Sequence, residues 1–160
     1  MNSYDAWQSA KSDFDRGDLP NARRWAELSL SISDETSVEA WIGAHRSLAL
    51  ICWKQDDLHG SRNHFAQEER LLGERGTVEN ERLIAAKDDL ALLEYKLRHF
   101  SEALRLRREV LRLAEADQHV SPIQLRRLRR RLAQSLQQHG ATRAAESLYA
   151  KSQPDDTDPF

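Results

Sequence analysis

The stretch that decides the fold is DLALLEYKLRHFSEALRLRREV, residues 89–110. It contains two leucine-rich segments, each able to bury one face of a helix, joined at the tripeptide RHF. A small residue lies on each side of this junction, Ala91 before it and Ala103 after it. Small side chains let two helices approach closely, whereas larger ones would hold them apart. The stretch therefore predicts a helical hairpin.

The same pattern recurs along the chain. Its anchors are alanines that lie seven residues before each predicted turn: Ala10, Ala49, Ala91 and Ala133, at spacings of 39, 42 and 42 residues. Twelve residues after each anchor stands a small residue, namely Ala22, Ser61, Ala103 and Ala145. A repeat of about 40 residues that pairs two helices is typical of solenoid proteins. We therefore expect an all-α fold, a right-handed α-solenoid of about four helical hairpins (eight helices) with a short disordered C-terminal tail.

Helix start and stop signals set the expected boundaries. The segments 36–39 and 121–124 are predicted capping boxes, and the second has a proline at its first helical position. Gly17 and Gly140 fall in predicted turns. We expect one repeat domain over residues 1–152, with units at approximately 3–35, 36–76, 77–117 and 121–152, and an acidic flexible tail at 153–160. The predicted helices cover residues 3–16, 19–33, 37–55, 57–73, 78–97, 99–116, 122–139 and 141–152.

Composition narrows the class of protein. The 160 residues are 39% hydrophobic and 31% charged, with few prolines and glycines, which is typical of a helix-rich globular chain. The first residues do not have the pattern of a signal peptide, and no apolar run approaches the roughly 20 residues of a membrane helix. The single cysteine, Cys52, cannot form an intramolecular disulfide and fits a reducing compartment. We expect a cytoplasmic protein with no membrane segment.

The net charge of −2 hides a gradient along the chain. Residues 1–97 carry 12 basic and 18 acidic side chains, whereas residues 98–152 carry 12 basic and 5 acidic ones. The run LRRLRRRL, residues 125–132, places five arginines around a leucine stripe. Three interpretations stay open for it: a solvated helix face, a site for an acidic partner, and a nucleic-acid surface. The last is the least favoured, because no aromatic side chains are interleaved for base stacking.

At the repeated residues the sequence resembles the tetratricopeptide repeat family. The resemblance is clearest in LALLEYKLRHFSEALRLRREVL and covers about residues 3–152. The units are longer than the common 34 residues, so they are similar to the longer-helix repeats of kinesin light chains and bacterial quorum-sensing regulators. Asp13, Cys52 and Glu94 stand where the family usually has an aromatic residue or leucine, and Arg107 replaces a core-type residue.

An array of this kind has a concave groove lined by the first helix of each unit. Positions −6, −3, +1 and +4 from each anchor lie close together on a helix. The expected groove residues at and beside these positions are Tyr4, Trp7, Lys11, Phe14, Arg46, Leu50, Trp53, Lys54, Asp88, Leu92, Tyr95, Arg127, Arg130, Gln134 and Gln137. The aromatic column at +4, Phe14, Trp53 and Tyr95, either faces the groove as binding hot spots or packs between units.

The sequence shows little sign of catalysis. The six histidines, at positions 45, 59, 64, 99, 119 and 139, have no metal-ligand spacing on one helix face, and one cysteine excludes a thiolate zinc site. No nucleophile elbow, phosphate loop or dinucleotide fingerprint occurs. We therefore expect no enzyme activity, no cofactor and no metal.

The expected function is a non-catalytic protein–protein interaction module, an adaptor or scaffold that binds a peptide or helix of a partner in its groove. The alternatives are a small cytosolic chaperone of the type III secretion kind, and a nucleic-acid-associated regulator that uses the arginine-rich fourth repeat. The tail QPDDTDPF, residues 153–160, is acidic and ends in an aromatic residue. It is either a solvated terminus or a segment that occupies a groove, which would produce self-association.

Overall fold

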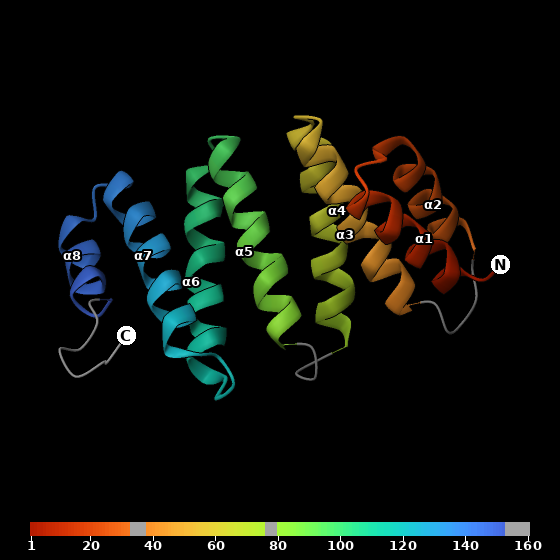
Figure 1. Cartoon of the computed structure of the whole chain (residues 1–160). Helices are drawn as coiled ribbons and strands as arrows, with labels where there is room; N and C mark the ends of the chain where they lie inside the picture. Colours follow the sequence, from red (N-terminus) through yellow and green to blue (C-terminus); the bar gives the residue numbers. More distant parts are fainter. Residues whose placement is uncertain (33–37, 76–79, 153–160) are drawn as a thin grey trace. The chain divides into compact units, whose positions relative to one another are not determined.

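The computed structural model describes residues 1–32, 38–75 and 80–152, and within these ranges it contains helices and no strand (Figure 1). The helices are α1 (Ser3–Asp15), α2 (Leu19–Ser31), α3 (Val38–Lys54), α4 (Leu58–Glu74), α5 (Asn80–Lys96), α6 (Phe100–Ala116), α7 (Pro122–Gln138) and α8 (Thr142–Ala150). The all-α prediction is confirmed. Each of these bounds lies within two residues of the predicted one.

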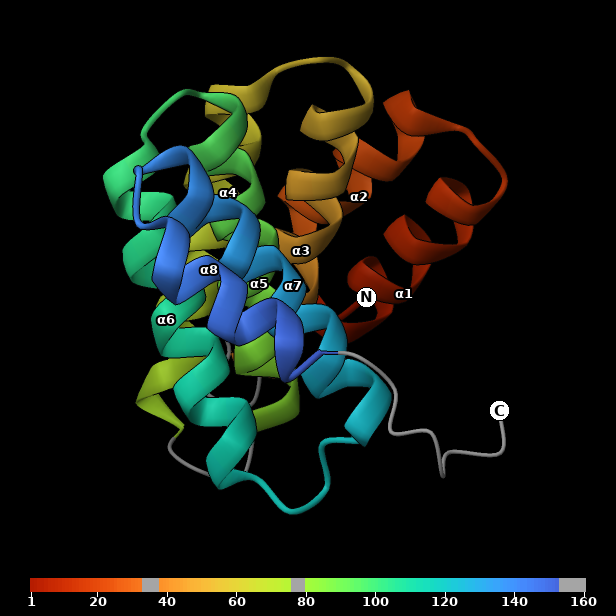
Figure 2. The same cartoon turned by 90° about the vertical axis from the view of Figure 1, so that its left-hand side faces the viewer.

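The helices belong to two compact units, Met1–Glu79 and Asn80–Phe160. In the first unit, α1 packs on α2 and α3, α2 packs on α3, and α3 packs on α4. In the second unit, α5 packs on α6, α6 on α7 and α7 on α8, an order that Figure 1 shows and that Figure 2 views from the α8 end. Each unit therefore consists of two successive helical hairpins. The predicted repeat units 3–35 and 36–76 fall in the first and 121–152 falls in the second, whereas 77–117 belongs to the second from residue 80 onward.

The turn inside every hairpin has the same backbone geometry. The residue seven positions after the anchor has a positive φ: Gly17 (84°), Asp56 (60°), Arg98 (64°) and Gly140 (76°). The next N–H in the chain donates to the carbonyl five residues back: Asp18 to Asp13 (2.9 Å), Asp57 to Cys52 (2.9 Å), His99 to Glu94 (2.8 Å) and Ala141 to Leu136 (2.9 Å). This bond and the left-handed residue define the Schellman motif, which ends a helix and satisfies its last carbonyl groups. The repeat is thus present in the backbone as well as in the sequence.

The small residues of the repeat lie where the two helices of a hairpin meet. The anchors Ala10, Ala49, Ala91 and Ala133 are all 0% exposed, and Ala22, Ser61, Ala103 and Ala145 are 0–2% exposed. In the second hairpin the Ser61 hydroxyl donates to the carbonyl of the anchor Ala49 at 2.8 Å, so these two backbones are only one small side chain apart. Burial of both sets agrees with the close-packing role predicted for them.

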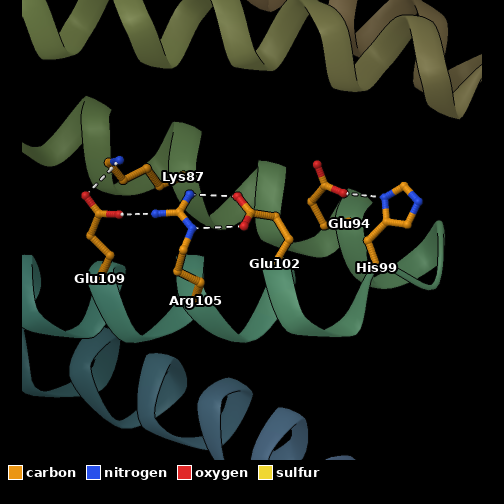
Figure 3. Close-up of polar contacts among 6 residues, drawn as sticks. All are labelled: Lys87, Glu94, His99, Glu102, Arg105 and Glu109. Carbon is orange, nitrogen blue, oxygen red and sulfur yellow. Dashed lines mark hydrogen bonds and ion pairs between the residues drawn. The ribbon is translucent and has the colours of Figure 1, made fainter.

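Three departures from the family pattern share one place in the fold. Asp13, Cys52 and Glu94 are all buried, and each supplies the carbonyl that accepts the turn bond. The side chain of Asp13 is paired with Arg16, while a carboxylate oxygen of Glu94 lies 2.7 Å from Nδ1 of His99 (Figure 3). A buried carboxylate needs such a partner. These polar residues are tolerated because the hairpin end brings a basic side chain within reach.

An ion pair joins α5 to α6, and further ion pairs lie along α6 (Figure 3). Nζ of Lys87 on α5, a buried side chain, lies 3.0 Å from a carboxylate oxygen of Glu109 on α6. Arg105 approaches Glu109 at 3.2 Å and Glu102 at 2.7 Å. The Lys87 ammonium is therefore neutralised inside the hairpin, and Arg105 holds the accepting carboxylate in position.

Capping signals explain where several helices begin. The box at Ser121 is confirmed, because the Ser121 hydroxyl accepts from the N–H of Gln124 and the Gln124 side chain accepts from the N–H of Ser121. A second box, Asn2 with Asp5, opens α1. The first two residues of the capping box predicted at 36–39, and the tail 153–160, lie outside the described residues. In the part of the chain that the structure describes, no helix combines the length and apolar character that a bilayer span requires.

Candidate protein-binding surface

Successive first helices meet through the same two repeat positions in both units. In the first unit, Nζ of Lys54 on α3 stands 4.3 Å from the centre of the Phe14 ring on α1. In the second, the side-chain amide of Gln138 on α7 donates to the Tyr95 hydroxyl on α5 at 2.5 Å. Phe14 and Tyr95 occupy position +4 of their repeats, and Lys54 and Gln138 occupy position +5 of the following ones. Phe14, Trp53 and Tyr95 are all half-buried, and a polar side chain of the next first helix contacts the Phe14 ring and the Tyr95 hydroxyl.

The aromatic side chains at the start of α1 form a separate contact. The Trp7 indole lies directly on Gly43 of α3, so that a Cβ at residue 43 would overlap the ring. Tyr4 packs edge-on against Trp7, with ring centroids 5.3 Å apart, and is 51% exposed. Lys11, one turn further along α1, is exposed, whereas Leu50 and Trp53 on α3 are half-buried. The first unit thus offers an aromatic surface whose outer member is Tyr4.

Arg46, an expected groove residue, contacts α4 of its own hairpin. Its guanidinium donates to the carboxylate of Glu68 on α4 at 3.0 Å and stands 5.9 Å from the Phe65 ring. Glu68 is 1% exposed, and a buried carboxylate without a cation nearby would be costly. The Arg46 charge therefore balances Glu68 inside the α3–α4 hairpin.

The face of α7 that meets α5 differs from the predicted one. Asp88 of α5 is buried and paired with Arg131, whereas Nη2 of Arg130 donates to the carbonyl of Ser152 at 3.4 Å. Arg127 lies on the shared face. Gln134 and Gln137 are exposed, Leu92 is half-buried, and the residues that contact α5 or line the surface beside it are Gln124, Arg127, Leu128, Arg131 and Gln138. The expected set is thus rotated by about one residue, or 100°.

A half-open pocket of about 180 Å³ lies between α5 and α7 in the second unit. It is lined by Glu81, Ile84, Ala85, Asp88, Asp117, His119, Val120, Gln124, Arg127 and Leu128. Aliphatic side chains form much of its wall, and the exposed side chains of Glu81 and Arg127 stand at it with opposite charges. Its volume is close to that of one large side chain. Asp88 and Arg127 are among the predicted groove residues. The loop residues Asp117, His119 and Val120 were not predicted, because they come to the pocket only through the fold of the α6–α7 loop.

Members of the arginine run have partners within the second unit. Arg129 is paired with Glu115 at 2.9 Å, Arg131 with Asp88, and Arg130 donates to a backbone carbonyl. Burial lowers the pKa of Arg131. These contacts favour a structural role for the three side chains. A structural role agrees better with the interpretation of the run as an ordinary helix face than with a binding site.

Folding also joins two histidines that the sequence separates. His45 on α3 and His64 on α4 lie with their Nδ1 atoms 3.1 Å apart. The spacing of histidines within single helices gives no sign of this pair, because the two residues lie on different helices. Within the described residues no group of three or more histidine, cysteine, aspartate or glutamate side chains is arranged to hold a metal ion.

Comparison with known proteins identifies the architecture. No protein-family model matches the chain, and no curated protein sequence matches it. A solved structure described as BtubC (BKLC) from P. vanneervenii is similar, with a TM-score of 0.76 and 17% sequence identity. The match covers 89% of this chain and 58% of that one, so the chain spans less than two thirds of its neighbour's length. With its eight described helices in successive hairpins, the chain has an all-α helical-repeat fold.

Proposed function

We propose that this chain is a non-catalytic interaction module of the tetratricopeptide kind, which binds an extended or helical segment of a partner protein along its first helices. The observation that carries the proposal is the pocket between α5 and α7, a concave surface with apolar walls and charged side chains at its edge. Such surfaces accept an apolar anchor side chain, while polar groups around it set the orientation. We propose that the partner places one large apolar side chain in this pocket.

The charges beside the pocket suggest what flanks that anchor. Glu81 on α5 and Arg127 on α7 are exposed and line opposite sides of it. A partner segment with a basic residue on one side of its apolar anchor and an acidic residue on the other would match both charges. Electrostatic matching of this kind fixes orientation and raises the association rate more than it raises affinity.

The remaining parts of the proposal concern the cellular setting. We propose a cytosolic location, which is supported by the single buried cysteine, Cys52. An adaptor and a secretion chaperone would both use the same surface, so the identity of the partner separates them. Affinity capture from the native extract with mass spectrometry identifies that partner, and its binding segment then serves as the ligand in the measurements that follow.

The test fills the pocket without disturbing the core. Ala85 is a half-buried pocket residue, so Ala85→Arg should occupy the pocket and weaken partner binding at least tenfold by calorimetry. Ala144→Arg, on the exposed face of α8, is the matched control and should bind as the parent does. Equal affinity of the Ala85→Arg variant and the parent would place the partner on another surface.

Two further measurements separate the alternatives. If a nucleic acid is the ligand, its affinity should fall steeply with salt, and Arg127→Glu should reduce it for all sequences alike. If the tail competes for the pocket, deletion of residues 153–160 should raise the affinity for the partner segment. Binding of RNA or DNA at low salt, together with no binding of any protein segment, would overturn the proposed function.

A further inference from the structure

The pair His45–His64 joins two packed helices. The two Nδ1 atoms are 3.1 Å apart, the ring centroids are 5.4 Å apart, and the ring planes make an angle of 37°. Both side chains are half-buried, so solvent still reaches the pair. A contact between two ring nitrogens requires one N–H donor and one free lone pair, so at least one of the rings is neutral.

The surroundings keep both rings neutral near pH 7. Burial lowers the pKa of His45 to about 4, with His64 and Arg70 adding to the effect. Burial also lowers the pKa of His64, helped by the positive charge of Arg23. Neutral imidazole is the form that binds metal ions.

The charges near His64 include both signs. Arg23 acts to lower its pKa, whereas Asp57 and Glu27 act to raise it. Two carboxylates therefore stand near the pair together with the guanidinium groups of Arg23 and Arg70. The negative charges of the two carboxylates therefore offset the positive charges that a divalent cation would meet at this pair.

We propose that His45 and His64 chelate a divalent first-row transition-metal ion of the nickel, copper or zinc class. Metal–imidazole bonds are about 2.0–2.1 Å long, and two such bonds across the observed separation make an angle of about 100°. That angle lies between those of square-planar and tetrahedral coordination, and imidazole nitrogen suits all three ions. The donating ring shifts its proton from Nδ1 to Nε2, both Nδ1 lone pairs then face the ion, and water fills the remaining positions.

The packing of α3 on α4 prepares this geometry in advance. The Schellman turn at Asp56 and the bond from Ser61 to the Ala49 carbonyl fix the two helices against each other. The ion therefore cross-links two helices that are already in place. Binding of the ion raises the stability of the first unit. It does not involve the pocket of the second unit, which is the proposed site for the partner protein.

The test is a calorimetric titration of Ni²⁺ into the full chain, prepared without an affinity tag, at pH 7.5. We expect one site per chain, with affinity reduced at least tenfold in His45→Gln and in His64→Gln. His59→Gln and His139→Gln, both exposed positions, are the matched controls and should bind as the parent does. Circular dichroism verifies that each variant is folded. Equal binding by the parent and the two pair variants, or no binding by the parent, would overturn the site.

Two measurements on the parent protein make the test independent of substitution. Paramagnetic Cu²⁺ should broaden the ring signals of His45 and His64 in nuclear magnetic resonance spectra before those of the other histidines. Affinity should also fall less between pH 7 and pH 5.5 than it would at two ordinary histidines, because burial lowers the pKa of both rings. Two ordinary histidines, with pKa values of about 6.5, would lose roughly 50- to 100-fold over that range. Broadening of other histidines first, or a loss of that size, would contradict the proposal.

Discussion

Arg98 and Asp56 hold a backbone conformation that glycine holds in the other two turns. Their φ values, 64° and 60°, lie in the left-handed region, where a side chain with a Cβ is strained by about 1 kcal/mol. Both side chains are exposed. The second and third hairpins therefore form their turns in spite of the residue at this position.

This strain gives a direct prediction for Arg98→Gly. The substitution should raise the free energy of unfolding by about 0.5–1 kcal/mol, because glycine adopts the positive φ without a steric cost. Urea denaturation measures the change. Arg108→Gly, at an exposed site inside α6, is the control and should lower stability by about 1 kcal/mol. A lower denaturation midpoint for Arg98→Gly would show that the contacts of the Arg98 side chain stabilise the fold by more than the strain of the positive φ destabilises it.

Gly43 is the opposite case, a helical glycine required by its neighbour. In Gly43→Ala the added Cβ would overlap the Trp7 ring, and we expect a loss of about 1–3 kcal/mol although alanine favours the helix. In the control, Gly73→Ala, no heavy atom of the described residues comes within 4 Å of the new Cβ, so stability should rise slightly. Thermal unfolding compares the two variants, and the Gly43→Ala loss should shrink when Trp7 is also replaced by leucine.

The hairpin is the element that the sequence specifies best. Small residues at fixed offsets, a Schellman turn and capping residues are all local signals, and each operates within a few residues of the chain. Helix bounds could therefore be predicted closely. Contacts between helices could not, because a rotation of one residue turns a helix by 100° and changes which side chain meets the neighbour. Arg131 rather than Arg130 reaches toward α5 for this reason.

For the same reason, the contact between His45 and His64 could not be predicted from the sequence. Each lies on its own helix, and only the α3–α4 packing sets the distance between their nitrogens. Two lining residues of the pocket between α5 and α7, Asp88 and Arg127, are among the predicted groove residues. Its loop residues carry no periodic pattern, so no signal in the sequence marks them.

Close approach of the hairpin helices predicts the cost of a larger side chain between them. Ala145 on α8 is 2% exposed, so Ala145→Leu should lower the free energy of unfolding by roughly 1–3 kcal/mol through overpacking. The neighbouring Ala144 is exposed, and Ala144→Leu should change stability by less than about 0.5 kcal/mol. Chemical denaturation of the pair measures the difference. Equal midpoints would mean that the α7–α8 contact is looser than the burial of Ala145 implies.

At the scale of the whole molecule, the lowered pKa of His45 predicts sensitivity to acid. As pH falls from about 6.5 to about 4, the unfolded chain binds a proton at His45 that the folded chain does not. The free energy of unfolding should therefore decrease through this window, by about 1–2 kcal/mol for this side chain. Stability measured against pH should fall less steeply in His45→Gln than in the parent, with His59→Gln as the exposed control. Parallel curves for His45→Gln and the parent would contradict the assignment.

The Schellman turn that all four hairpins share has a consequence for how the chain folds. Helices within each unit contact helices that are near in sequence, and every turn closes through bonds inside its own hairpin. A low average separation between contacting residues is associated with fast folding, in microseconds to milliseconds for helical proteins of this kind. During synthesis, a hairpin has all its turn bonds available before the next one leaves the ribosome. Folding should therefore begin near the N-terminus and advance one hairpin at a time, so that the growing chain exposes little unfolded apolar surface to its neighbours.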